Sequence, residues 1–350
     1  MRISGSGRSA RRRVSQADIA RQAGVTQAAV SMILRDRADG IPEATRQRVL
    51  AIARELGYRA DPLARRLANG RSQIIGVFTY EKVFPVAHRT FYHRFLLGIE
   101  EAAEAHDQDL LLFTSAAAGR GTGRSDGARS IYAGGENKLR LADAAVLLGR
   151  DEIPAELEQL CAEDYQFVFI GRRFLADGRE VPNVAPDYAT ATRALTRRFA
   201  TLGHRRIAYL GTDPTLPASA DRLSAITAGD LDVHLHFAPV TEIDDVLLHR
   251  LLETGVTGLM LENSAYAERV AGLAAQLEAG RKAQLSLAVA GLTEEDPTPW
   301  SGFTVPGHRI GYQALTDLLA RLEGAPPGCR LVPCPEAPGR TLGAVPPDTG

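Results

Sequence analysis

Short apolar runs alternate with amphipathic stretches along most of the chain, from residue 74 onward. Seven of these runs have the length of buried strands, and they cover residues 74–79, 110–114, 144–148, 167–170, 207–210, 258–261 and 285–290. Stretches with helical apolar spacing lie between them, for example 95–106, 189–202, 244–253 and 265–279. Apolar strands that alternate with helices are typical of parallel sheets covered on both faces. Seven strands are more than we expect in a single sheet. We therefore predict an α/β core over residues 74–350 that is divided into two lobes.

Residues 14–59 follow a different pattern, which begins with a capped helix and a tight turn. Ser15 and Asp18 have the spacing of a capping box, with Asp in place of the usual Glu or Gln. The helix is expected to run to about Gln22. The turn that follows contains Gly24, which can adopt a positive φ. The cap and the glycine turn together predict a short helix that is joined to a second helix by a tight turn.

The second and third helices of this segment have their own start signals. Thr26 is a favourable N-cap for a helix over residues 27–34. Pro42 suits the first turn of a helix that runs to about Leu56. Two short helices joined by a glycine turn and packed on a third predict an all-α helix-turn-helix domain, whose second helix fits the major groove of DNA. The alternative is a plain three-helix bundle.

The two faces of the second helix differ in chemistry. The predicted buried seam of the domain consists of Ile19, Ala20, Val25, Val30 and Leu34. The predicted outer face consists of Gln27, Ala28, Ser31, Met32 and Arg35. We expect the outer face to contact the partner.

Charge is distributed unevenly along the chain. The first 73 residues contain 15 arginines, no lysine and 6 acidic residues, whereas the whole chain has a net charge of −1. A basic block on an acidic body predicts a polyanion partner for that block, and a solvated arginine-rich surface is the alternative. Residues 1–13 are rich in Arg, Gly and Ser and are predicted to form a disordered basic arm.

Several classes of protein are disfavoured by composition and motifs. The chain has no apolar run of about 18 residues and no apolar stretch within residues 1–13, so we expect a soluble cytoplasmic protein without a membrane partner. Its three cysteines lack metal-binding spacing, and HExxH does not occur. GxSxG occurs once, as GRSDG at residues 123–127, but this match lies in a loop-like stretch rich in Gly, Ala, Ser and Arg, without the strand–turn–helix context of a catalytic serine. We therefore expect no metal, no cofactor and no catalytic residues.

The helical segment resembles a known family. Residues 14–26 (VSQADIARQAGVT), 42–49 (PEATRQRV) and 55–58 (ELGY) are similar to the opening of the LacI/GalR family of bacterial repressors. The resemblance implies a sequence-specific, homodimeric regulator that binds double-stranded operator DNA and represses sugar-utilisation genes. It also implies that base edges are read by Gln27, Ala28 and Met32 and that phosphates lie near Thr26 and Ser31. Ser15 and Arg35 complete the headpiece residues expected at the DNA, and Met32 and Arg35 depart from the family's commoner residues.

Residues 60–73 are predicted to be a hinge. Asp61 and Pro62 suit a helix start, but seven or eight residues are too few to be helical alone in water. The family resemblance implies that this segment folds on DNA and wedges Leu67 into the minor groove beside the small residue Ala64, with Arg65 on phosphate. An ordinary interdomain linker is the alternative.

The resemblance continues into the core. Residues 202–211 (LGHRRIAYLG) are a family landmark, and the family's core is similar to periplasmic sugar-binding proteins, whose ligands lie between two lobes. It implies a sugar effector bound by Arg222 and Asn263, with Thr293 and Glu294 where the family usually has an aspartate pair. Phe91 and Tyr92 are either an aromatic wall for a sugar or part of the helix packing. Two alternative functions are a sugar-binding protein and a sugar-modifying enzyme, each without a DNA role.

Overall fold

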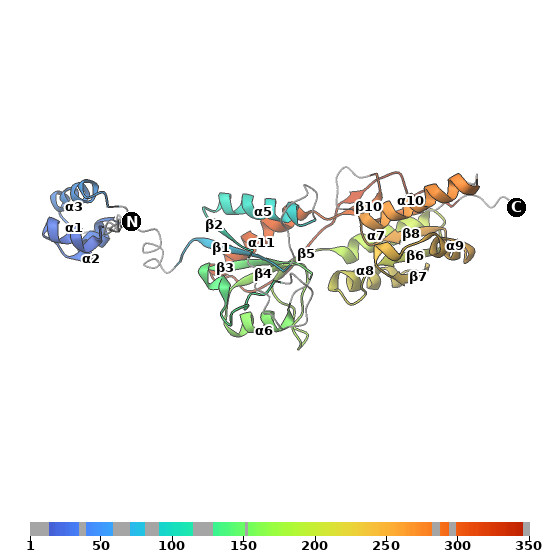
Figure 1. Cartoon of the computed structure of the whole chain (residues 1–350), viewed down its shortest axis with the longest axis horizontal. Helices are drawn as coiled ribbons and strands as arrows, with labels where there is room; N and C mark the ends of the chain where they lie inside the picture. The colour runs from blue at the N-terminus through green and yellow to red at the C-terminus, as the bar shows by residue number, and fades with distance from the viewer. Residues whose placement is uncertain are drawn as a thin grey trace, which may run out of the picture. The chain divides into compact units, whose positions relative to one another are not determined.

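The computed structural model describes residues 14–34, 40–58, 71–80, 91–114, 129–150, 153–281, 288–293 and 299–345. The chain divides into two compact units, Met1–Ser72 and Gln73–Gly350. Each unit is considered by itself below. The first contains the helical headpiece, and the second contains the α/β core (Figure 1).

Three helices form the headpiece, and their bounds are α1 (Gln16–Ala23), α2 (Gln27–Leu34) and α3 (Glu43–Glu55). The predicted capping box is present at the start of α1: the amide of Ser15 donates to Asp18 Oδ2 at 3.0 Å, and the amide of Asp18 donates to Ser15 Oγ at 3.3 Å. Gly24 ends α1 at φ 66°, a conformation that glycine adopts without steric cost. Both ends of α1 are therefore specified by neighbouring residues.

The buried seam of the headpiece differs in part from the prediction. Ile19, Ala20 and Val30 are buried as expected, but Ile33 is buried where Leu34 was expected, and Val25 and Leu34 are only half-buried. Positions three and four residues apart share a helix face, so Val30 could pair with either residue. The packing of α2 against α1 and α3 selects Ile33 and leaves Leu34 at the edge.

Loss of the cap should loosen the headpiece without affecting the core. Ser15→Ala removes the hydroxyl that accepts from the Asp18 amide, so we expect headpiece stability to fall by about 1 kcal/mol. Hydrogen exchange of the α1 amides, measured by mass spectrometry on the full chain, should then rise about fivefold. Core peptides provide the internal control. Unchanged exchange in α1 would contradict a stabilising role for this cap.

Two six-stranded sheets form the core. The first has the strand order β11-β5-β4-β3-β1-β2, and the second has the order β12-β10-β9-β8-β6-β7. The strands of the first sheet are β1 (Ile74–Thr79), β2 (Asp109–Phe113), β3 (Ala144–Leu148), β4 (Phe167–Ile170), β5 (Asn183–Pro186) and β11 (Cys329–Val332). Those of the second are β6 (Arg206–Gly211), β7 (Asp232–Phe237), β8 (Gly258–Leu261), β9 (Ala288–Thr293), β10 (Ser301–Thr304) and β12 (Glu336–Ala337). All pairs of neighbouring strands are parallel except β10 and β12, which confirms the predicted α/β class with two parallel sheets.

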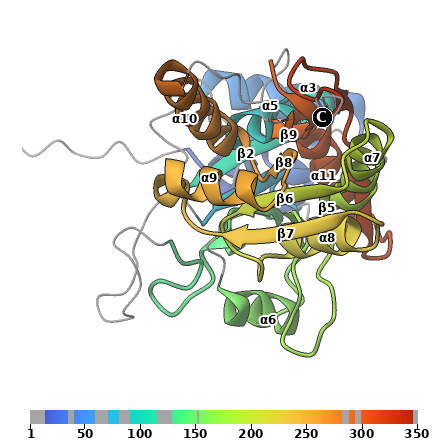
Figure 2. The same ribbon diagram turned by 90° about the vertical axis from the view of Figure 1, so that its right-hand side faces the viewer.

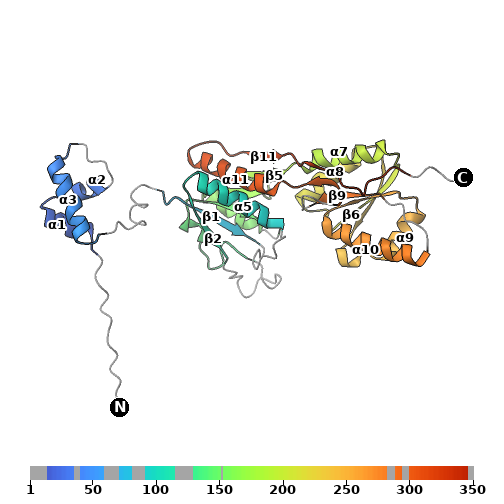
Figure 3. The same cartoon turned by 90° about the horizontal axis from the view of Figure 1, so that it is seen from above.

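Helices cover both faces of each sheet. Their bounds are α5 (Phe91–Ala105), α6 (Pro154–Ala162), α7 (Tyr188–Thr201), α8 (Pro217–Thr227), α9 (Asp245–Glu253), α10 (Ser264–Arg281) and α11 (Gly307–Leu322). In the first lobe α5 and α11 lie side by side on one face and α6 lies on the other (Figures 1 and 3). In the second lobe Ile207 and Tyr209 of β6 belong to an apolar cluster with residues of α7 and α8, while Ala208 and Leu210 belong to a cluster with residues of α9 and α10. Figure 2 shows these four helices around the strands of the second sheet. Successive residues of a strand point to opposite faces, so a continuous apolar run serves both layers.

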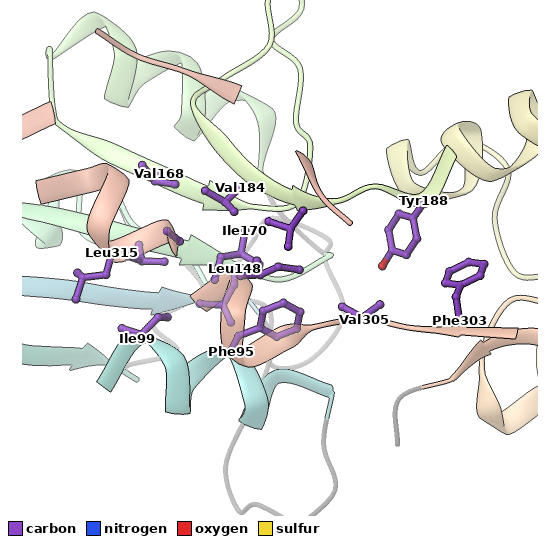
Figure 4. Close-up of a cluster of buried hydrophobic side chains, with 14 of the residues drawn as sticks. Phe95, Ile99, Leu148, Val168, Ile170, Val184, Tyr188, Phe303, Val305 and Leu315 are labelled. Carbon is purple, nitrogen blue, oxygen red and sulfur yellow. The ribbon is translucent and has the colours of Figure 1, made fainter. Parts of the chain in front are cut away.

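The chain passes between the two lobes three times. The crossings follow β5, β10 and β11, because the next elements, α7, α11 and β12, belong to the other lobe. Val305 lies on the second crossing, between the first-lobe cluster around Phe95 and the pair Tyr188 and Phe303 (Figure 4). Apolar packing therefore continues from one lobe to the other along these segments.

Five strands were not among the seven predicted runs, namely β5, β7, β10, β11 and β12. Strand β7 lies at a sheet edge and reads DVHLHF, so alternating polar residues interrupt its apolar pattern. Strand β10 reads SGFT, and β5 ends in a proline. These strands are recruited by their neighbours in the sheet, and their own residues carry little strand signal.

Candidate functional site

The outer face of α2 is the candidate DNA interface. Gln27 and Ala28 are exposed, Met32 is 43% exposed, and Ser31 is half-buried, whereas Val30 on the opposite side is buried. An amide, a methyl group and a thioether thus project from a helix of eight residues. Thymine methyl groups and adenine edges in the major groove match these groups chemically.

Two further headpiece residues act locally in the fold. Thr26 Oγ1 accepts from the amide of Ala29 at 3.2 Å, so Thr26 caps α2 as predicted. The Ser15 hydroxyl donates to Asp18 Oδ2 at 2.7 Å within the capping box. Their contacts with DNA stay predictions. The predicted DNA contacts Arg35, Ala64, Arg65 and Leu67 lie outside the described residues.

A cavity of about 340 Å³ lies in the core, lined by residues of both lobes. Its first-lobe wall includes the start of α5 and the residues that follow β3 and β4. Its second-lobe wall includes the start of α8 and the residues that follow β8. Ligands of open parallel sheets bind at the carboxyl ends of the strands, and this cavity has that position in both sheets.

Arg222 of α8 is the most deeply buried cation of the cavity wall, at 5% exposure. Its Nη1 lies 3.6 Å from Glu262 Oε1, and its guanidinium carbon lies 4.1 Å from the centre of the Tyr188 ring. Among the described residues its Nε has no hydrogen-bond partner. Burial opposes the charged form of Arg222, but Tyr188, Tyr209 and Glu262 outweigh it and raise its pKa. The guanidinium therefore stays charged inside the cavity.

Glu262 follows β8 and is held by the second lobe. Its Oε2 accepts from the Thr212 amide at 2.5 Å and from the Thr212 hydroxyl at 2.7 Å. Its Oε1 accepts from Ser219 Oγ at 3.5 Å. The carboxylate is thus oriented by the fold before any ligand arrives.

Arg172 joins the two lobes across the cavity. Its Nε and Nη2 donate to the carboxylate of Glu180 in the first lobe at 2.8 and 3.2 Å, and its Nη1 donates to Asp221 Oδ1 of α8 at 2.6 Å. The bonds from Arg172 lower the pKa of Glu180. Burial raises the pKa of Asp221, and the same guanidinium opposes that shift. This charged contact ties the end of β4 to the start of α8.

Arg173 borders the same cavity and is 8% exposed. Its Nη2 donates to the carbonyl oxygen of Gly149, and its Nη1 donates to the carbonyl oxygen of Arg172, both at 2.6 Å. Its guanidinium carbon lies 4.6 Å from the centre of the Phe169 ring. Neutral carbonyls and an aromatic face thus hold this cation in place.

The structure brings four of the six predicted effector residues to this cavity: Phe91, Tyr92, Arg222 and Asn263. Phe91 also packs against Phe95, with ring centres 4.9 Å apart, so its two interpretations are compatible. Asn263 Oδ1 accepts from the amide of Ala265 at 3.0 Å and thereby caps α10. Thr293 ends β9, and Glu294 lies outside the described residues.

Sequence reasoning missed several charged residues of the wall, namely Arg150, Arg172, Arg173, Asp221 and Glu262. A signal for three of them was available. Arg150 comes two residues after β3, Arg172 comes two residues after β4, and Glu262 directly follows β8. The rule that ligands bind at the carboxyl ends of parallel strands would have selected these positions.

Comparison with known proteins agrees with both units. Residues 16–61 match the family "Bacterial regulatory proteins, lacI family", and residues 81–228 match "Periplasmic binding proteins and sugar binding domain of LacI family". The maltose regulon regulatory protein MalI of Escherichia coli (strain K12) is 25% identical over 331 residues, which cover 87% of this chain and 91% of that protein.

Solved structures show the same fold. One is a lac repressor dimer bound to operator and the anti-inducer ONPF, with a TM-score of 0.67, 17% identity and coverage of 95% of this chain and 100% of that one. Another is a complex of the transcriptional regulator CelR with cellobiose, with a TM-score of 0.57, 21% identity and coverage of 93% and 100%.

A helix-turn-helix unit and a two-lobed core with an interlobe cavity define a DNA-binding transcriptional regulator of the repressor type. The chain belongs to the LacI family of bacterial regulatory proteins. In the described part of the chain no helix has the length and apolar character needed to span a membrane. The same residues contain no cluster of three or more side chains suited to hold a metal ion.

Proposed function

We propose that this chain is a cytoplasmic, non-catalytic repressor of sugar-utilisation genes whose affinity for operator DNA is controlled by a carbohydrate in the core cavity. The observation that carries the proposal is the pairing of an exposed α2 face with a cavity lined by both lobes. A homodimer supplies two headpieces for a two-fold operator, as in the lac repressor dimer bound to operator. The bound cellobiose of CelR supports a sugar as the ligand class.

Control of DNA affinity follows from the two-sided cavity wall. A ligand that touches both lobes stabilises the lobe arrangement in which both sets of contacts are made. If that arrangement differs in its affinity for DNA, ligand and operator are thermodynamically coupled, by 1–3 kcal/mol in typical cases. In this structure the two lobes are arranged so that Arg172 and Asp221 are in contact at 2.6 Å.

The test measures DNA binding by the full chain. An operator is first selected from random duplexes, and its affinity is then measured with and without a panel of mono- and disaccharides. We expect preference for the selected duplex over random competitor and a change of about 5- to 150-fold with the cognate sugar. Absence of any sequence preference at moderate salt would overturn the proposal.

Readout by α2 can be tested at one side chain. Gln27→Ala removes the amide that we propose to bond an adenine, so specific affinity should fall by about 1–3 kcal/mol while affinity for random DNA changes little. Fluorescence anisotropy with both duplexes measures this difference. Gln47→Ala is the matched control, because Gln47 is exposed on α3 and bonds Glu43 within the same helix. An equal loss in both variants would contradict base reading by Gln27.

A further inference from the structure

We infer that the effector is an anionic sugar, with a carboxylate or phosphate group bound by the arginines of the cavity. The inference rests on the proposed function, because it assigns a ligand class to the same site. It deepens that function by separating charged from neutral carbohydrates. The geometry and charge of the described wall carry it.

Positive charge dominates the described wall of the cavity. Four arginines and two acidic residues line it: Arg150, Arg172, Arg173, Arg222, Asp221 and Glu262. Walls of low dielectric strengthen the field of such a group of charges inside a cleft. A ligand with a negative group is attracted to this site. The excess of positive charge adds no such attraction for a neutral sugar.

Both carboxylates of the described wall accept hydrogen bonds from the protein. Asp221 Oδ1 accepts from Arg172 at 2.6 Å. Glu262 accepts from the amide and hydroxyl of Thr212 and lies 3.6 Å from Arg222. A sugar hydroxyl both donates and accepts hydrogen bonds, whereas guanidinium groups only donate. This wall therefore suits a ligand group that only accepts hydrogen bonds, which describes a carboxylate or a phosphate.

Arg222 has a donor that the described residues leave without an acceptor. Its side chain is 6% exposed, its nearest carboxylate oxygen is beyond hydrogen-bond distance at 3.6 Å, and its Nε has no hydrogen-bond partner among the described residues. Leaving a buried donor unsatisfied costs free energy, more so for a charged group. The planar guanidinium fork matches the two oxygens of a carboxylate or phosphate. An oxyanion in the cavity would supply the missing acceptor.

The ligand should also contain a sugar-sized body. A cavity of about 340 Å³ exceeds the space that an inorganic anion fills, and its wall includes the rings of Phe91, Tyr92 and Tyr188. Aromatic rings cover the apolar faces of a pyranose well. Arginines and aromatic side chains together therefore favour a sugar acid or a sugar phosphate over free phosphate.

Isothermal titration calorimetry on the full chain tests the inference. The probes are glucose, galactose and mannose, each as the neutral sugar, the uronic acid and the 6-phosphate, with inorganic phosphate and sulfate alongside. We expect one charged series to bind at least 30-fold more tightly than its neutral parent, and the comparison of uronic acids with 6-phosphates identifies the source of the charge. Tighter binding of the neutral parents, or binding of inorganic phosphate alone, overturns the inference.

Two variants locate the charge contact. Arg150→Met removes an exposed cation of the cavity wall. We expect the affinity for the charged probes to fall at least 10-fold and the affinity for the neutral probes to change less than twofold. Arg222→Lys keeps the charge but loses the fork, and the same selective loss is expected. Arg205→Met, an exposed arginine outside this cavity wall, is the control and should change neither class. Equal losses for charged and neutral probes at Arg150 would overturn the inference.

A parallel measurement of operator affinity separates the two proposals. Charged probes that bind the cavity but leave DNA affinity unchanged support the ligand class and contradict the proposed control of DNA binding. A neutral sugar that binds more tightly than its charged derivatives and changes DNA affinity contradicts the ligand class and supports the proposed control of DNA binding. Failure of every probe to bind overturns the anionic-sugar inference, while sequence-specific DNA binding still stands or falls on the operator selection.

Discussion

Gly98→Ala should lower the stability of the core by about 3 kcal/mol, because the added methyl group has no space. A Cβ atom at Gly98 of α5 would lie 1.9 Å from the carbonyl oxygen of His308 and 2.7 Å from the amide nitrogen of Tyr312, both on α11. These are backbone atoms that cannot rotate away. The two helices must move apart. Buried residues of both helices, such as Ile99 and Leu315, then lose packing contacts.

The same helix pair contains a reciprocal close approach. A Cβ atom at Gly311 of α11 would lie 2.0 Å from the carbonyl oxygen of Phe95 on α5. Gly311→Ala should therefore be as damaging as Gly98→Ala. Since both changes separate the same helices, the double variant should cost less than the sum of the two single changes.

Thermal unfolding followed by circular dichroism measures these effects. A loss of about 3 kcal/mol should lower the midpoint of the core transition by roughly 6–12 °C. Gly272→Ala is the matched control, because Gly272 lies within α10 and a Cβ there meets no atom within 4 Å. Alanine at that exposed position should stabilise the helix by about 0.5–1 kcal/mol. A Gly98→Ala variant as stable as the parent would contradict the tight helix contact.

Arg222→Met should abolish the response to the effector and leave operator binding without effector intact. The guanidinium is buried in the wall of the core cavity, whereas the proposed DNA-reading residues are on the separate headpiece unit. Loss of a charge-assisted contact to a ligand weakens binding by about 2–5 kcal/mol, which is at least about 30-fold. Titration of the effector into the repressor–operator complex measures the response.

Removal of Arg222 also has a cost to folding that can be separated from its role in binding. Glu262 is 7% exposed, and in Arg222→Met it would stay buried without the nearby cation. Breaking a buried pair by removing one partner is destabilising by 3–5 kcal/mol in typical cases, and the bonds from Thr212 should reduce this here to about 2 kcal/mol. Glu262→Gln in the same chain removes the uncompensated charge. The double variant should regain most of the lost stability and still fail to respond to the effector, and recovery of the response would contradict a ligand contact by Arg222.

Local chemistry allowed the headpiece to be predicted from its residues. The capping box at Ser15 and Asp18, the positive φ of Gly24 and the Thr26 cap each act within four residues, so the ends of α1 and α2 follow from neighbours in the sequence. The central strands were also predictable, because β1, β3, β4, β6 and β8 are buried between layers and must be apolar on both faces.

The cavity was predictable only in part. Arg222, Asn263, Phe91 and Tyr92 were expected through the resemblance to the family, and they do line it. The remaining charged wall was not expected, because its members stand in segments that follow different strands and show no common motif. A sequence pattern reports spacing along one segment, whereas Arg172 and Asp221 are 49 residues apart and meet at 2.6 Å across the lobes.

The sequence by itself determined the three helix starts of the headpiece, the apolar strands at the centre of each sheet and the division between a basic head and an acidic core. These features depend on interactions within a few residues or on the total apolar content of a segment. Only the tertiary structure decided that Ile33 is buried in place of Leu34, that DVHLHF forms an edge strand, and which charges surround the cavity. The physical reason is that packing and charge pairing depend on residues that the chain brings together from distant positions.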